Sequence, residues 1–144
     1  MDLQIDDFYR DAAAGLLMLY QAFPRKITLY VDDLIGHEEP DEFGLPSKRH
    51  QSCLGALLWL GEEGYLRYES TIQQLALDQV VLTEKAFLRL TCTLPEAEAE
   101  NSDLPASVRR MHYSLAHQIR QRLRDGYSEH LAQLTRQLFT SRTH

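Results

Sequence analysis

The stretch from Ser47 to Leu90 decides the fold, and it reads SKRHQSCLGALLWLGEEG, YLRYES, TIQQ, LALDQVVLT and EKAFLRL in order. Ser47 offers a helix cap, and apolar residues then recur at spacings of three and four, which predicts a helix over Ser47–Gly64. Alternating apolar residues on either side of TIQQ predict a β-hairpin over Tyr65–Leu82, and Thr83 can cap the next helix. We expect six apolar side chains to share one core: Leu54, Leu57, Leu58, Leu66, Leu82 and Phe87.

Two runs within this stretch resemble the winged helix-turn-helix superfamily. Residues 56–66, ALLWLGEEGYL, are similar to the end of its third helix and its second strand. Residues 81–87, VLTEKAF, are similar to the "LTxKG" segment that closes the wing, with Ala86 where glycine is common. The resemblance covers about residues 27–91. It implies a first strand at Ile27–Val31 and a short second helix at Asp32–Gly36, and the superfamily binds DNA, RNA and proteins.

Helical patterns flank this region on both sides. Between Phe8 and Phe23 apolar residues occupy more than one side of a helical wheel, which is typical of a helix covered on more than one side. From Leu104 to Leu138 they recur at spacings of three and four, with Gly126 as a weak point, so this is one bent helix or two consecutive helices.

The chain is therefore predicted to be mainly α with a small β-hairpin, an α+β fold. Its three parts are an N-terminal helix with the winged-helix domain (1–92), an acidic linker (93–103) and a C-terminal helical segment (104–144).

The stripe from Leu104 to Leu138 needs a cover, because so long an apolar face is not stable alone in water. In several winged-helix families flanking helices build a dimer, so the resemblance implies a homodimer. Its partner-binding residues would include Leu115, Ile119 and Leu123. Packing of the stripe on the first helix of its own chain is the alternative.

Charge is distributed unevenly along the chain. Residues 1–103 hold 19 acidic against 8 basic residues, whereas residues 104–144 hold 7 arginines against two acids. Six acids cluster in a region that lies near phosphates in a DNA-bound winged helix: Asp32, Asp33, Glu38, Glu39, Asp41 and Glu42. Nucleic-acid affinity comes largely from Lys and Arg at phosphates, so this cluster would repel DNA.

The candidate DNA contacts lie at the start of the third helix and on the hairpin: Lys48, Arg49, Gln51, Arg67, Gln73 and Gln74. The alternative is that these side chains are ordinary solvated surface. Trp59 falls on the side of the helix opposite its apolar face, and tryptophan is favoured at protein interfaces. It is therefore the candidate centre of a partner-binding surface, unless it packs on the hairpin or on the C-terminal helix.

Several classes of protein are disfavoured. An acidic start and an apolar run of only nine residues, Ala12–Tyr20, predict neither a secretory signal nor a membrane span, and two cysteines fit a cytoplasmic protein. Neither a phosphate-binding loop nor a nucleophile pattern is present, so we expect no enzyme and no cofactor. His50 and Cys53 are three residues apart without a second pair at finger spacing, so we expect no metal.

Two functions remain open. The predicted function is that of a dimeric, winged-helix DNA-binding protein of the transcriptional-regulator type. The alternative, which the acidity of the chain favours, is a winged-helix protein-interaction module or accessory subunit that does not contact DNA.

Overall fold

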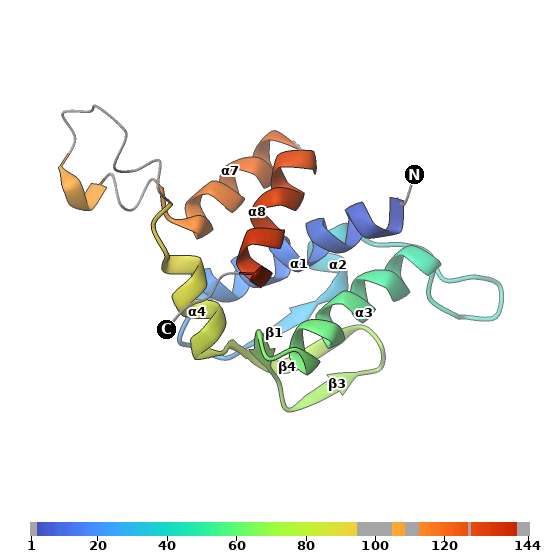
Figure 1. The fold of residues 1–144 in the computed structure, drawn as a ribbon. Helices are drawn as coiled ribbons and strands as arrows, with labels where there is room; N and C mark the ends of the chain where they lie inside the picture. Colours follow the sequence, from blue (N-terminus) through green and yellow to red (C-terminus); the bar gives the residue numbers. More distant parts are fainter. Residues whose placement is uncertain (1–2, 95–104, 109–112, 127, 141–144) are drawn as a thin grey trace.

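Helix α1, Leu3–Ala22, lies at the centre of the computed structural model, which describes residues 3–94, 105–108, 113–126 and 128–140 (Figure 1). It contacts α3 on one side and the C-terminal helices α7 and α8 on the other. Ala12, Ala13 and Leu16 are fully buried. The prediction that this helix is covered on more than one side is therefore confirmed.

A small antiparallel sheet lies below α1, and its central strand is β4 (Figure 1). β4 pairs with β1 on one side and with β2 and β3 on the other. From β1 to α4 the elements are β1 (Ile27–Tyr30), α2 (Val31–Ile35), α3 (Lys48–Glu62), β2 (Leu66–Arg67), β3 (Ser70–Ile72), β4 (Ala76–Leu82) and α4 (Glu84–Thr91). The α+β class and the predicted hairpin are confirmed, although the first strand of the hairpin is divided into β2 and β3.

Side-chain caps set the starts of the helices that flank this hairpin. The Ser47 hydroxyl accepts a hydrogen bond from the backbone N–H of His50 at 3.0 Å. The Thr83 hydroxyl accepts one from Ala86 at 3.3 Å. Gly64 follows α3 with a φ of 81°, a left-handed conformation that glycine adopts without strain. The predicted caps at Ser47 and Thr83 are therefore confirmed.

The C-terminal stripe forms two helices, α7 (Leu115–Asp125) and α8 (Ser128–Thr140), and not one helix from Leu104. Ser114 caps α7 through the N–H of His117 and forms an isolated β-bridge with Thr93, so a helix from residue 104 cannot run through this point. Gly126 ends α7 in the left-handed conformation. Most of the predicted acidic linker, from residue 95 on, lies outside the described residues.

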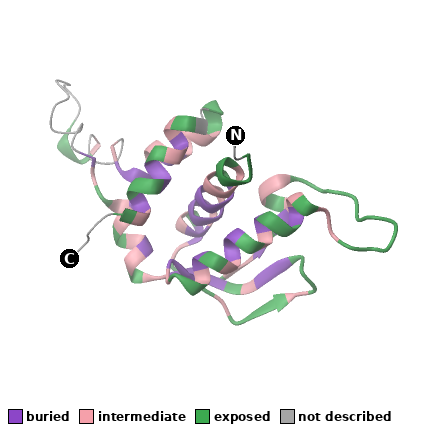
Figure 2. Cartoon of the chain, turned by 45° about the vertical axis from the view of Figure 1, so that its right-hand side comes forward, coloured by how far each residue is buried: buried purple, intermediate pink, exposed green. Residues whose placement is uncertain are grey.

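One hydrophobic core extends over both ends of the chain (Figure 2). α7 and α8 contribute Leu115, Ile119 and Leu138, each at most 1% exposed. Of the six residues expected to share a core, three are buried in it: Leu57, Leu66 and Leu82. The other three are partly buried and pack against it: Leu54, Leu58 and Phe87. The N-terminal and C-terminal segments therefore share their core. Among the described helices, none has the length and apolar composition needed to cross a bilayer.

Candidate functional site

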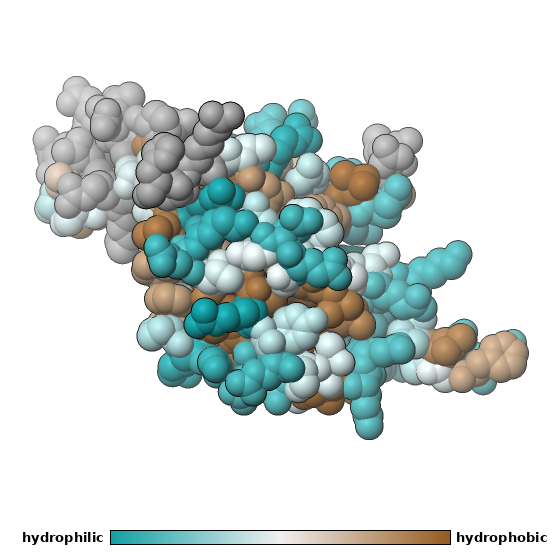
Figure 3. Space-filling model, turned by 60° about the horizontal axis from the view of Figure 1, so that its bottom comes forward, coloured by the Kyte–Doolittle hydropathy of each residue, from teal (hydrophilic) through white to brown (hydrophobic). Residues whose placement is uncertain are grey.

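A groove runs between α3 and the hairpin, on the side that the sequence predicted to bind. Figure 3 shows apolar side chains exposed among polar ones on the face that comes forward from the bottom of Figure 1. It has a volume of about 370 Å³, and its lining residues are Gln51, Leu54, Gly55, Leu58, Thr71 and Gln74. Leu54 and Leu58 are half-buried because α3 turns Cys53, Leu57 and Leu60 toward the core. Their remaining surface forms the apolar wall of the groove.

Gly55 lies in this groove and has open space above it. A Cβ built on Gly55 meets no atom within 4 Å, and the residue is exposed in the middle of α3. Glycine weakens a helix interior by about 1 kcal/mol relative to alanine. The glycine thus leaves room beside α3 that a larger side chain would fill.

Arg49 forms an ion pair with a buried carboxylate of α1. Its Nη1 and Nη2 donate to the two carboxylate oxygens of Asp11 at 2.7 Å each, and Asp11 is 2% exposed. The pair joins α3 to α1 and raises the pKa of Arg49 through the hydrogen bonds to Asp11. This guanidinium neutralises a buried carboxylate, so a contact with DNA would compete with a structural role, and the DNA contact at Arg49 stays a prediction. Sequence reasoning did not identify Asp11 as a buried charge. The signal that could have found it is an acidic residue beside Ala12, Ala13 and Leu16, on a helix predicted to be covered on more than one side.

The other predicted DNA contacts are exposed side chains. Lys48 and Arg67 face solvent on α3 and β2, and Gln51 donates to the Pro46 carbonyl at 2.8 Å. Gln73 and Gln74 form the tip of the hairpin, with φ angles of 45° and 62°. A two-residue loop with both φ positive matches a turn that follows the twist of its strands. Gln74 also lines the groove, so the groove and the predicted hairpin contacts overlap.

Trp59 belongs to an aromatic cluster that joins α1, α3 and α8. Its ring lies 5.2 Å from Phe8, 6.3 Å from Tyr65 and 5.4 Å from Phe139, measured between ring centroids. The side chain remains 37% exposed. Packing on the C-terminal helix, the alternative for Trp59, accounts for one of these three contacts, that with Phe139 of α8, and the role of Trp59 as the centre of a partner-binding surface stays a prediction.

Arg89 fastens α8 to this cluster. Its Nη1 donates to the backbone carbonyls of Leu138 at 3.0 Å and Phe139 at 3.3 Å, and to the Tyr65 hydroxyl at 3.1 Å. A cation at the last carbonyls of a helix satisfies acceptors that have no partner within the helix. α8 is thereby fixed to α4.

Two of the three C-terminal residues predicted to bind a partner are used within the chain. Leu115 and Ile119 are each 1% exposed and lie in the core against α1 and α4. Packing within the chain, the alternative that the sequence left open, therefore describes both residues in this structure, and their contact with a second molecule stays a prediction. Leu123 is half-buried and packs at the edge of the same core.

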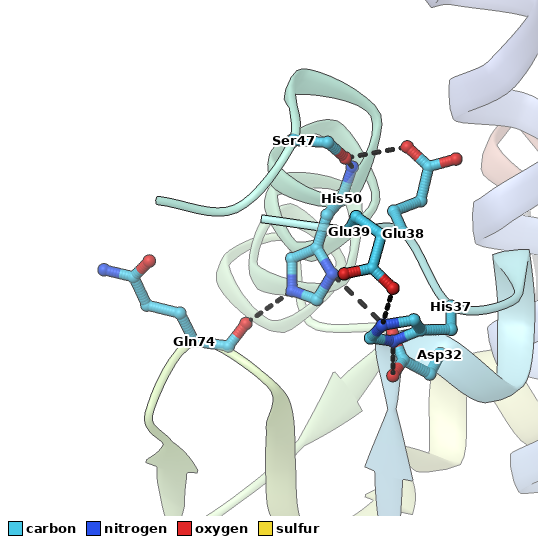
Figure 4. A network of polar contacts seen from close by, with 7 residues as sticks. All are labelled: Asp32, His37, Glu38, Glu39, Ser47, His50 and Gln74. Carbon is cyan, nitrogen blue, oxygen red and sulfur yellow. Dashed lines mark hydrogen bonds and ion pairs between the residues drawn. The ribbon is translucent and has the colours of Figure 1, made fainter. Parts of the chain in front are cut away.

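The acidic loop between α2 and α3 borders a second cavity, which we call the acidic cleft. It has a volume of about 430 Å³ and is lined by Asp32, His37, Glu38, Pro40, Gly44, Leu45, Pro46, His50, Gln73, Gln74 and Leu75. Figure 4 shows the polar contacts at its wall. His37 lies between two carboxylates, with Nδ1 3.3 Å from Asp32 and Nε2 3.4 Å from Glu39, and the hydrogen bond to Asp32 raises its pKa.

His50 is buried behind this cleft, and its tautomer follows from its neighbours. Nε2 lies 2.7 Å from the carbonyl oxygen of Gln74, which can only accept, so Nε2 carries the hydrogen (Figure 4). Nδ1 lies 3.8 Å from Oδ1 of Asp32, beyond hydrogen-bond distance. In the neutral ring Nδ1 is therefore an acceptor beside a carboxylate.

Cys53 is fully buried one helical turn after Arg49. Burial raises the pKa of its thiol to about 12, and the neighbouring charge of Asp11 acts in the same direction. Cys92, the second free thiol, is exposed at the end of α4. Within the described part of the chain, no group of three or more His, Cys, Asp and Glu side chains is arranged to hold a metal ion.

Comparisons of the chain with protein-family models, curated proteins and solved structures found no match.

Proposed function

We propose that this protein is an interaction module that binds an extended segment of a partner protein in the groove between α3 and β3. The observation that carries the proposal is the apolar wall formed by Leu54 and Leu58 beside the open position at Gly55. Water in such a groove is readily displaced by apolar side chains of a partner. The exposed polar groups of Gln51, Thr71 and Gln74 can then hydrogen-bond the partner's backbone.

The order of the elements supports a winged-helix-type scaffold for this module. A helix, a strand, two helices and a hairpin follow one another, and β1 pairs with the last strand of the hairpin. This is the arrangement that the resemblance in residues 56–66 and 81–87 implies. Scaffolds of this type serve several kinds of partner, so the choice of partner rests on the surface.

The surface charge favours a protein partner over a nucleic acid. Residues 26–85 hold 11 acidic and 5 basic residues. Two of these basic residues have acidic partners within the fold, Arg49 with Asp11 and Lys26 with Glu69. Affinity for DNA requires cations that neutralise phosphates, and this segment of the chain carries an excess of negative charge.

DNA binding as a transcriptional regulator is the second candidate. It is favoured by the exposure of Lys48 and Arg67 and by the glutamines at the hairpin tip. In that case α3 would lie against the phosphates and the groove would have no occupant.

Replacing Gly55 by glutamine (G55Q) should weaken partner binding while stabilising the fold. The new side chain would occupy the groove, so the affinity of a bound peptide should fall by about 30-fold, the effect of losing a strong interface anchor. The free energy of unfolding should rise by about 1 kcal/mol, because glycine leaves the interior of α3. A random peptide library displayed on phage, selected on the wild-type protein and counter-selected on G55Q, supplies the probes.

Gly55→Ala is the matched control, since a methyl group stabilises α3 and leaves most of the groove open. It should keep peptide binding within a few-fold of wild type. Lys48→Ala should leave peptide binding unchanged, whereas a DNA-bound α3 would lose about 0.9 in the salt slope of its affinity. If the selection yields no peptide that binds the wild-type protein more tightly than G55Q, the proposed function is refuted.

A further inference from the structure

The acidic cleft and the groove meet at the tip of the hairpin. Gln74 lines both cavities, and the consecutive residues His50 and Gln51 of α3 line one cavity each. A segment lying along α3 between Leu58 and Gln51 would therefore reach the acidic cleft with its next residues. The two cavities offer different chemistry to one extended partner.

The lining of the acidic cleft combines acceptors with apolar walls. Asp32 and Glu38 contribute carboxylates, and the buried ring of His50 lies beside Asp32, with its Nδ1 3.8 Å from Oδ1. Pro40, Leu45 and other apolar residues form the rest of the lining. The long side chains of arginine and lysine pack their carbon stems on apolar surface and need acceptors for their charged ends.

We propose that the acidic cleft binds an arginine or lysine side chain of the same partner segment whose apolar residues occupy the groove. This proposal rests on the proposed function and names the chemistry of the partner: apolar residues followed by a basic one. Charge complementarity selects this occupant, because a basic side chain brings a permanent positive charge to a cleft that holds two carboxylates. The present partners of these carboxylates are histidine rings at Asp32 and the hydroxyl of Ser47 at Glu38. Arginine has five donors in a planar fork, so it should be preferred to lysine.

His37 should make this binding depend on pH. When protonated, its ring neutralises Asp32 and Glu39 and competes with the basic side chain of the partner. The hydrogen bond to Asp32 and the charge of Glu39 raise the pKa of His37, so the competing form persists to higher pH than for an ordinary histidine. The other ionisable groups at this wall are Glu38 and His50.

Affinity for a basic peptide should therefore rise as pH increases through the pKa of His37. A titration of peptide binding by fluorescence anisotropy between about pH 5.5 and 8.5 covers the range in which histidines titrate. Replacing His37 by glutamine should weaken this dependence and raise the affinity at the acidic end. An affinity with the same pH profile in both proteins would show that His37 does not compete.

The decisive experiment uses peptides recovered on the wild-type protein and lost on G55Q. Their sequences should be enriched in arginine or lysine beside apolar residues. Replacing that basic residue by glutamine should weaken binding to the wild-type protein about tenfold, the loss expected for hydrogen bonds to charged groups. In the double variant Asp32→Asn with Glu38→Gln, the same change in the peptide should have little effect.

Asp33→Asn is the matched control, because Asp33 is the exposed neighbour of Asp32 on α2 and does not line the cleft. It removes one negative charge, where the double variant removes two, and it should leave the preference for the basic peptide intact. Circular dichroism melts confirm that each variant is folded. Peptides that bind in the groove with no preference for a basic residue would overturn the cleft proposal and leave the proposed function standing. Failure to recover any groove-dependent peptide would overturn both.

Discussion

Replacing Arg49 by alanine should lower the free energy of unfolding by about 3 kcal/mol, since it leaves a buried carboxylate without its cation. Asp11 is 2% exposed and both of its oxygens accept from Arg49 at 2.7 Å. Arg49 is itself 27% exposed, which places the expected loss at the lower end for pairs of this kind. Urea denaturation followed by circular dichroism measures it.

The neighbouring Lys48 gives the control for this prediction. It is exposed, so Lys48→Ala should change the stability by no more than about 0.5 kcal/mol. Adding Asp11→Ala to the Arg49→Ala variant should recover much of the lost stability, because the unpaired charge is then gone. If Arg49→Ala is as stable as Lys48→Ala, the ion pair does not hold α1 to α3. Arg49 would then be free to act as a surface contact.

Replacing Ile119 by alanine should cost about 3 kcal/mol, the middle of the range for a fully buried aliphatic side chain. The loss should be the same at every protein concentration, because Ile119 is buried against helices of its own chain. A dimer held together by α7 would instead become more stable as the protein is concentrated.

Chemical denaturation at two protein concentrations about 100-fold apart separates these cases by mass action. Leu123→Ala is the comparison variant, since Leu123 is only half-buried and should lose less stability. A denaturation midpoint that increases with concentration, and an effect of Ile119→Ala that shrinks with it, would contradict packing within the chain. Light scattering on the same samples gives the mass.

Local sequence signals were sufficient for the elements but not for the orientation of α3. Ser47, Gly64 and Thr83 marked the ends of helices correctly because capping involves only neighbouring residues. The apolar spacing predicted that α3 has a buried face, but it did not predict which residues of that face are most deeply buried. Leu54 was among the residues expected to share the core and is half-buried, whereas Cys53, which was not among them, is fully buried.

The position of α1 explains why α3 buries Cys53 more fully than Leu54. A Cβ added to Gly15 would lie 2.9 Å from a methyl carbon of Leu57, which shows how closely the two helices approach. Such an approach depends on residues 42 positions apart, and periodicity within one helix does not contain it.

The sequence indicated which elements carry the candidate site, but it indicated only some of the residues that line it. The sequence placed its candidate DNA contacts on the third helix and the hairpin, and two of these residues, Gln51 and Gln74, line the groove. The pairing of Arg49 with Asp11 could not be read, because it links two helices through a contact that leaves no spacing pattern. For the same reason the stripe containing Leu115 and Ile119 predicted burial correctly but did not tell which surface covers it.

The burial of Cys53 makes its reactivity a measure of motion. A thiol is modified as its thiolate, and this one has a pKa of about 12 and no exposed surface, so the native state protects it. Cys92 is exposed and reacts without any change in the fold. The protein should therefore take up one equivalent of an alkylating reagent quickly, at Cys92. It should take up the second, at Cys53, only as fast as α3 separates from α1. The kinetics of that slow phase report how often the helices separate, with no probe added to the natural chain.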